Sequence, residues 1–443
     1  MHNHVLDREW NAASLLRFAF PTIVMMLFMG LYTIVDTIFV AQFVGTDALS
    51  AVNIVCPVIN VTVGLGTMLA AGGNAVISRE MGAGRDREAG KNLTLLTLVA
   101  AAVGVLLFLA GTVWLEELVR ALGAGGRLTP YCKAYLGTLL LFLPANVIQT
   151  VFASLFVTAG RPGLGLALSV LAGISNIVLD YVLIVLCGLG IRGAALGTGV
   201  GYLIPAVSGI FFFLKNDGAL SFALPEWKPG VLKESCLNGS SEMVGQLAAA
   251  VTTFLFNVTM MDLAGEDGVA AVTIMIYAQF LLNTLYIGYS MGVAPVIGFY
   301  YGNQNGVRQE KVIRISIGFV MAASVLLCLA SGLGGSYIVR LFAPGTSEVY
   351  RLAAAGFPVF STSFLLCGLN IFTSAMFTAL SNGKLSAALS FLRTFVLLSG
   401  GILLLPQIFG ITGVWLAVPA AEGIMFLVSA SVLFLYRVKK RLS

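Results

Sequence analysis

The chain has 443 residues, of which 58% are hydrophobic and only 10% are charged, and its mean hydropathy is +0.95. Soluble domains carry about 25% charged residues, so the composition excludes a soluble globular protein and indicates a polytopic membrane protein. The net charge of +5 forms no concentrated basic patch and predicts no nucleic-acid partner. The first 14 residues are polar and no cleavage-site pattern follows, which argues against a cleaved signal peptide.

Twelve apolar segments are long enough to cross a bilayer, which takes roughly 20 helical residues. Helices are expected throughout, because a helix satisfies its own backbone hydrogen bonds in lipid. The predicted fold class is therefore an all-α polytopic membrane protein, with transmembrane helices near residues 15–40, 48–72, 93–115, 134–158, 164–188, 193–214, 238–263, 269–298, 313–335, 352–380, 385–408 and 413–436.

The first segment contains a carboxylate, Asp36, within the run IVDTIFV. A charge at membrane depth costs about 2.5–3.5 kcal/mol on insertion scales, so such a residue normally faces a cavity or a partner. The alternative is that Asp36 lies close enough to the helix end for its carboxylate to reach interfacial water. We interpret Asp36 as functional.

Lysine and arginine set the orientation. With both termini in the cytoplasm, 19 of the 25 basic residues fall on the inner side, as the positive-inside rule requires. The outer side then holds Arg120, Arg127, Lys133, Arg192, Arg340 and Arg351.

Further intramembrane polar residues occur in the fifth and sixth segments. Asn176 and Asp180 share one helix face because they are four residues apart, and Thr198 lies about one turn inside the sixth segment. In the predicted orientation these residues reach the depth of Asp36. Burial and a like-charged neighbour both favour a protonated carboxyl group, so the set can bind a proton or small cation. Separate interhelical hydrogen bonds that hold the bundle together are the alternative.

The chain repeats at a constant offset of 220 residues. VGTDALSAVNI (44–54) aligns with AGEDGVAAVTI (264–274), and no gap is needed over the whole length. Six crossings per half return the chain to the same side, so the halves insert in the same orientation, an arrangement found in transporters that alternate access. We predict an N-lobe of helices 1–6 at 1–220 and a C-lobe of helices 7–12 at 221–443. The aligned pairs include Gly45 with Gly265, Asp47 with Asp267, Gly82 with Gly302, Arg120 with Arg340, Gly190 with Gly410, and Gly193 with Gly413.

The second half lacks the polar set of the first. The positions at +220 from Asp36, Asn176, Asp180 and Thr198 are Phe256, Val396, Gly400 and Val418. The second half has instead Glu422, well inside its last helix and a candidate for cargo charge or a second ion. It also has Glu242, expected at the interface. Among the intramembrane prolines, Pro21 is the candidate hinge.

Motifs for other chemistry are missing from the sequence. There is no GxxxxGK[ST], HExxH or CxxC, and no GxSxG on a strand-to-helix elbow, so we expect an ion gradient to supply the energy, and neither an enzyme activity, a cofactor nor a resident metal. The six cysteines are scattered and are expected to be small packing residues.

The stretches PTIVMMLFMGLYTIVDTIFVAQFVGTDALSAV and AVISREMGAGRDREAGK, together with two parallel six-helix halves, resemble the multidrug and toxic compound extrusion (MATE) family. The likeness is strongest to its branch of DNA-damage-inducible-type (DinF) and MepA-like bacterial exporters. It implies a monomeric antiporter in the bacterial plasma membrane that exports amphipathic, cationic small molecules in exchange for H⁺ or Na⁺. It also implies a coupling site at Asp36, Asn176, Asp180 and Thr198, Na⁺ being possible there, and a bend at Pro21.

The C-lobe departs from the other MATE branch. That branch has acids in the seventh and tenth helices, and here Glu242 lies in the seventh but the tenth has none. This departure favours the N-lobe site. A flippase for a lipid-linked precursor, from the same superfamily, is the alternative function. Such flippases carry cavity cations that meet a pyrophosphate, and Arg393 is the one candidate within a helix. An uncoupled channel or membrane enzyme ranks below both.

Overall fold

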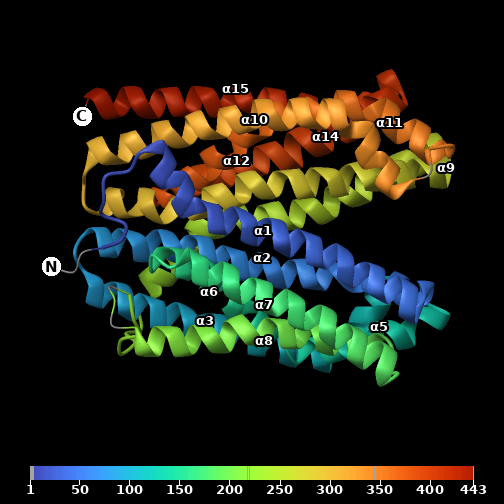
Figure 1. The fold of residues 1–443 in the computed structure, drawn as a ribbon, viewed down its shortest axis with the longest axis horizontal. Helices are drawn as coiled ribbons and strands as arrows, with labels where there is room; N and C mark the ends of the chain where they lie inside the picture. Colours follow the sequence, from blue (N-terminus) through green and yellow to red (C-terminus); the bar gives the residue numbers. More distant parts are fainter. Residues whose placement is uncertain (1–3, 217, 219, 344, 443) are drawn as a thin grey trace.

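The computed structural model describes residues 4–216, 218, 220–343 and 345–442. In these residues the chain forms helices joined by short loops (Figure 1). The helices are α1 (Ala12–Phe39), α2 (Thr46–Gly82), α3 (Asp86–Val113), α4 (Leu115–Ala121), α5 (Thr129–Leu140), α6 (Leu143–Thr158), α7 (Pro162–Asp180), α8 (Ile191–Lys215), α9 (Pro229–Gly302), α10 (Gly306–Phe342), α11 (Glu348–Ser361), α12 (Ser363–Ala379), α13 (Gly383–Phe391), α14 (Ser399–Phe409) and α15 (Ile411–Leu442). Three π-helical turns, η1 (Val40–Val44), η3 (Tyr181–Leu186) and η4 (Leu392–Leu398), and the 3-10 turn η2 (Gly126–Leu128) complete them.

The helices account for twelve membrane crossings. Within the described residues, nine helical stretches are long and apolar enough to span a membrane, and two bent helix pairs bring the number to 11. Helix α9 has 74 residues, about 110 Å if it were straight, and non-helical backbone at Gly265 divides it where the chain reverses direction (Figure 1). Counted as two helices, α9 supplies the remaining crossing, and the predicted all-helical fold is confirmed.

Two of the spans are sharply bent. The α5 and α6 segments meet at 57°, and α11 and α12 meet at 54°. Pro144 lies in the first turn of α6, and Pro358 lies one turn before the break at Thr362. Proline has no N–H to donate to the preceding turn, which explains why the first span breaks at the start of α6, whereas Pro358 lies within α11, before the second break. The short helix α4 and the extension of α2 to Gly82 were not predicted from hydropathy.

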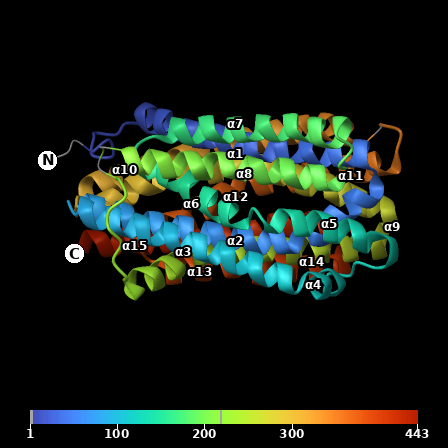
Figure 2. The same ribbon diagram turned by 90° about the horizontal axis from the view of Figure 1, so that it is seen from below.

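Helices α1–α8 form one bundle and α9–α15 a second, drawn below and above in Figure 1. We call them the N-lobe and the C-lobe. Both chain termini lie at the same end of the molecule, which we call the termini end (Figures 1 and 2). Helix α1 packs against α7 of its own lobe and against α9 of the other, so it touches both lobes. The domain boundary at residue 220 stays a prediction, within the linker between Lys215 and Pro229.

The aligned glycines of the repeat occupy matching turns. Gly45 and Gly265 both have positive φ, at 114° and 62°, and so do Gly190 and Gly410, at 54° and 57°. Glycine adopts positive φ without the steric cost that a β-carbon brings. These turns lie at the end of the bundle opposite the termini, and they require glycine in both halves.

The lobes meet in reciprocal backbone contacts at the termini end. A β-carbon on Gly82 would lie 1.9 Å from the carbonyl oxygen of Phe299, and one on Gly302 would lie 2.0 Å from that of Arg79. Arg79 and Phe299 are themselves 220 residues apart, so each lobe presents the same glycine to the same position of its sister. This contact is a pseudo-twofold interface between α2 and the second half of α9.

Charged groups reinforce the same interface. The guanidinium of Arg79 donates to both carboxylate oxygens of Glu234, at 2.5 and 3.0 Å, and to the hydroxyl of Ser381 at 3.1 Å. Arg308 donates to Asp7 at 2.8 Å. Among the described residues, the side-chain hydrogen bonds and ion pairs between the lobes all lie at the termini end, which is therefore the closed end of this conformation.

Candidate functional site

Asp36 lies one turn before the end of α1. Its backbone carbonyl accepts the N–H of Val40, where the helix changes into the π-turn η1. The side chain is half-buried. This depth, away from the termini end, is the one predicted from the sequence.

Asn176 and Asp180 project from α7, on the face predicted from their spacing. Asn176 is 2% exposed and Asp180 is fully buried. Asp180 is the last residue of α7, and the π-turn η3 begins at the next residue. Isolated π-turns within helices are frequent at functional sites, and here one such turn follows each of the two acids.

The carboxyl groups of Asp36 and Asp180 face each other within hydrogen-bonding range. One oxygen of Asp36 and both oxygens of Asp180 are buried, and no donor in the described part of the chain reaches them. Two carboxylates have no proton to give each other, so a hydrogen bond between them requires a proton on one. The structure thus brings the two predicted acids together and leaves three buried acceptor oxygens unsatisfied.

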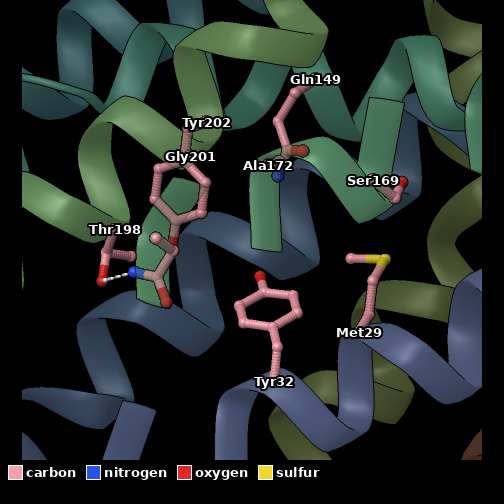
Figure 3. Close-up of a pocket in the computed structure, with 9 residues that line it drawn as sticks. Met29, Tyr32, Gln149, Ser169, Ala172, Thr198, Gly201 and Tyr202 are labelled. Atoms are coloured by element: carbon pink, nitrogen blue, oxygen red, sulfur yellow. Dashed lines mark hydrogen bonds between the residues drawn. The ribbon is translucent and has the colours of Figure 1, made fainter. Parts of the chain in front are cut away.

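Thr198 joins this group through Asn176. The amide of Asn176 donates to the Thr198 hydroxyl at 3.4 Å, marked by the dashed line in Figure 3. The amide oxygen of Asn176 is buried, and no donor in residues 4–216, 218, 220–343 and 345–442 reaches it. All four predicted residues of the N-lobe set therefore lie in one neighbourhood, formed by α1, α7 and α8.

A small pocket opens beside them, and Tyr32 points into it from α1 (Figure 3). The cavity measures about 20 Å³, room for roughly one water molecule. Its lining mixes hydroxyl, amide and apolar groups: Met29, Tyr32, Gln149, Ser169, Ala172, Asn176, Thr198, Gly201 and Tyr202.

In the part of the chain that the structure describes, neither carboxyl group has a cationic side chain beside it. Within the residues that the structure describes, no lysine, arginine or histidine forms an ion pair with Asp36 or Asp180. The groups within electrostatic reach are instead tyrosines, namely Tyr32, Tyr135 and Tyr202.

Residues that sequence reasoning missed complete the site. Gly197 of α8 packs directly against the Asp180 carboxylate, and Tyr32 and Tyr202 form pocket walls. Tyr32 is four residues before Asp36, and this helical spacing was the one available signal. For Gly197 the sequence offers only a glycine-rich stretch, without an indication of what it contacts.

The C-lobe candidates lie apart from this set. Glu422 of α15 is buried and forms an ion pair with Arg393 of η4, and the amide of Asn370 donates to its second oxygen. Glu242 of α9 is half-buried, and its carboxylate takes part in no hydrogen bond or ion pair among the described residues. Pro21 lies within α1, which continues unbroken through it, so a hinge at this residue stays a prediction.

Comparison with known families decides the class of protein. The family model MatE matches residues 21–182 and again 243–400. The chain belongs to the MATE family. The two matches are offset by about 220 residues, in agreement with the internal repeat. The protein is therefore a multi-pass membrane transporter and not an enzyme.

The MATE assignment holds over the whole length. The multidrug export protein MepA of Staphylococcus aureus (strain bovine RF122 / ET3-1) is 25% identical over 434 residues, 97% of this chain and 94% of the relative. MepA of Staphylococcus saprophyticus is 23% identical over 432 residues, with the same coverage.

Solved MATE structures share the fold. The crystal structure of MATE in complex with MaL6 superposes with a TM-score of 0.92 at 22% identity, covering 99% of this chain and 100% of that one. A multidrug resistance MATE family transporter of the MOP superfamily in its outward-facing conformation gives a TM-score of 0.91 at 23% identity, covering 98% of each chain.

Proposed function

We propose that this MATE transporter exports amphipathic organic cations in exchange for H⁺ or Na⁺. The distant MepA relatives are named multidrug export proteins, and the sequence holds no ATP-binding motif. The energy then comes from an ion gradient, and the exchange follows alternating access between the two lobes.

The observation that carries the proposal is the carboxyl pair with its unpartnered oxygens. Burying an ionised carboxylate without a partner costs several kcal/mol, so the pair is expected to take up a positive charge. A shared proton supplies the missing hydrogen bond between Asp36 and Asp180. A small cation would bind the same oxygens, with Asn176 and Thr198 as neutral ligands.

Ion binding at the carboxyl pair would affect the contact between the two lobes through α1. This helix carries Asp36 and touches both lobes, so a change in its packing alters the contact between them. An ion shifts the equilibrium only if it binds one conformation more tightly than the other. The excess of basic residues, 19 of 25 on one side, supports a cytoplasmic termini end, and the closed termini end then corresponds to an outward-facing state.

The test uses the purified full-length protein in proteoliposomes, with ethidium as cargo and H⁺ and Na⁺ gradients imposed separately. We expect one of the gradients to drive ethidium transport, and Asp36→Asn and Asp180→Asn to reduce the gradient-driven rate at least about tenfold, a barrier change of roughly 1.4 kcal/mol. Asp47→Asn is the matched control, because Asp47 pairs with Arg127 at the molecular surface. Full gradient-driven transport by both site variants would refute the coupling site.

A further inference from the structure

The C-lobe contains a buried charged cluster that the proposed coupling does not use. Arg393 donates from Nε and Nη2 to one oxygen of Glu422, at 2.9 and 2.6 Å. Asn370 donates from its amide to the other oxygen at 2.7 Å. Glu422 is 4% exposed, and Arg393 lies in the π-turn η4. Both carboxylate oxygens of Glu422 thus have donors.

The buried acids of the two lobes therefore differ in their partners. In the N-lobe, both oxygens of Asp180 lack a donor among the described residues, and the positive charge must come from solution. In the C-lobe, a guanidinium supplies that charge from within the chain. Arginine stays protonated throughout the physiological pH range and cannot leave, so the C-lobe acid has a permanent partner.

The repeat places this cluster at the C-lobe counterpart of the N-lobe pocket. Subtracting 220 from Glu422 gives Tyr202, which lines the pocket, and subtracting it from Arg393 gives Gly173. A β-carbon at Gly173 would lie 2.5 Å from the ring of Phe28 and 3.4 Å from that of Tyr32. In the C-lobe, the guanidinium of Arg393 reaches Glu422 of α15, the counterpart of the pocket-lining Tyr202.

We propose that Arg393 is a tethered counter-cation that occupies the C-lobe equivalent of the N-lobe pocket, so that Glu422 marks a latent cation site. This inference rests on the proposed function for its contrast with the N-lobe, but its own observations are the Arg393–Glu422 contacts and the repeat. Removing Arg393 leaves a buried carboxylate with one neutral donor. Such a group takes up a proton or a monovalent cation to avoid a buried unpaired charge.

The surroundings of Glu422 offer no second cation in the described part of the chain. The groups within its electrostatic reach are Arg393 from η4, Cys367 from α12 and Tyr286 from α9, and the hydrogen-bonding neighbour is Asn370. Cys367 and Tyr286 are neutral at pH 7. The positive charge of the cluster therefore resides on Arg393 alone.

The experiment compares purified full-length wild type with Arg393→Met, Arg393→Lys, Glu422→Gln and the double variant Arg393→Met/Glu422→Gln. Two readouts separate the two ions: saturable ²²Na⁺ binding, and the infrared carbonyl band of protonated carboxyl groups. We expect Arg393→Met to gain one additional bound Na⁺ or one additional protonated carboxyl group per protein. The double variant and Arg393→Lys are expected to show no gain.

Two results would overturn the inference. One is a folded Arg393→Met protein that gains neither signal relative to the double variant. The other, which does not depend on the stability of Arg393→Met, is a loss of bound Na⁺ or of a protonated carboxyl group in Glu422→Gln with Arg393 present, because Glu422 would then already exchange ions. Asp180→Asn tested in parallel reports on the N-lobe site, so the failure of one proposal is distinguishable from the failure of the other.

Discussion

Asp180 lies so close to Gly197 that a β-carbon at residue 197 would stand 2.3 Å from its Oδ1 atom. The glycine on α8 therefore fixes the position of the buried carboxylate on α7 and with it the approach to Asp36. Only a residue without a side chain leaves room for this arrangement.

Gly197→Ala is expected to displace the Asp180 carboxyl group, because the backbone of α8 cannot move as readily as the end of a side chain. Overpacking of this kind costs about 1–3 kcal/mol. We expect the apparent affinity for the coupling ion to fall roughly tenfold, about 1.4 kcal/mol, in proteoliposome transport measured against ion concentration. Gly163→Ala on α7 is the control, because a β-carbon there meets nothing within 4 Å. Equal affinities in both variants would contradict the prediction.

A second prediction concerns the interface between the lobes, where Gly72 and Gly239 allow the helices to come into close contact. A β-carbon on Gly72 would lie 1.8 Å from the carbonyl oxygen of Ser235, and one on Gly239 would lie 1.8 Å from that of Met68. The obstacle is backbone in both cases, so Gly72→Ala and Gly239→Ala must push the lobes apart. We expect each to lower the free energy of unfolding by about 1–3 kcal/mol, measured by denaturant unfolding of the purified protein. Gly318→Ala, with open space around it, should be unchanged, and a wild-type-like Gly72→Ala would show that the helices are not in contact there.

Hydropathy and buried charge were sufficient to predict the twelve crossings and the grouping of Asp36, Asn176, Asp180 and Thr198. Both signals can be seen within a short stretch of sequence. A transmembrane helix appears as a run of about 20 apolar residues, and an intramembrane acid appears as a charged residue within such a run. The +220 repeat added the equivalence of the two halves. The ion-coupling role of the four residues stays a prediction.

Contacts between distant segments could not be predicted in the same way. Glu422 and Arg393 were each noticed in the sequence, but nothing in it indicated that two residues on different helices form an ion pair. The sharp bend between α11 and α12 follows Pro358, whereas α1 continues as one helix through Pro21. Proline permits a bend, and the packing of neighbouring helices decides whether one forms.

A third prediction concerns the ion pair between Arg79 and Glu234, which joins the lobes at the termini end. Their side chains are 25% and 33% exposed, so solvent screens the pair, and exposed pairs contribute about 0.2–1 kcal/mol. A double-mutant cycle with Arg79→Ala and Glu234→Ala should give a coupling energy in that range for unfolding, and the coupling should shrink as NaCl is raised. A coupling energy that is zero at low salt would remove the ion pair from the forces that hold the lobes together.

The last prediction concerns the linker between the lobes and the pH dependence of stability. Glu226 accepts from Lys91 at 3.0 Å and lies 3.3 Å from Lys228, and these two ammonium groups lower the pKa of its carboxyl group below the ordinary value of 4.5. A carboxyl group with a lowered pKa in the folded state stabilises that state above its unfolded pKa, and the contribution is lost as the pH falls through the folded value.

Glu226→Gln should therefore be less stable than wild type at pH 7, by a small margin because the group is exposed. The difference should narrow once the pH drops below 4.5 and wild type takes up the proton. Thermal unfolding of both proteins in detergent between pH 7 and pH 3 measures this, with Glu9→Gln, a carboxylate of the N-terminal segment that forms no ion pair among the described residues, as the control. A difference that stays constant over this range would show that Glu226 is not held ionised by the two lysines.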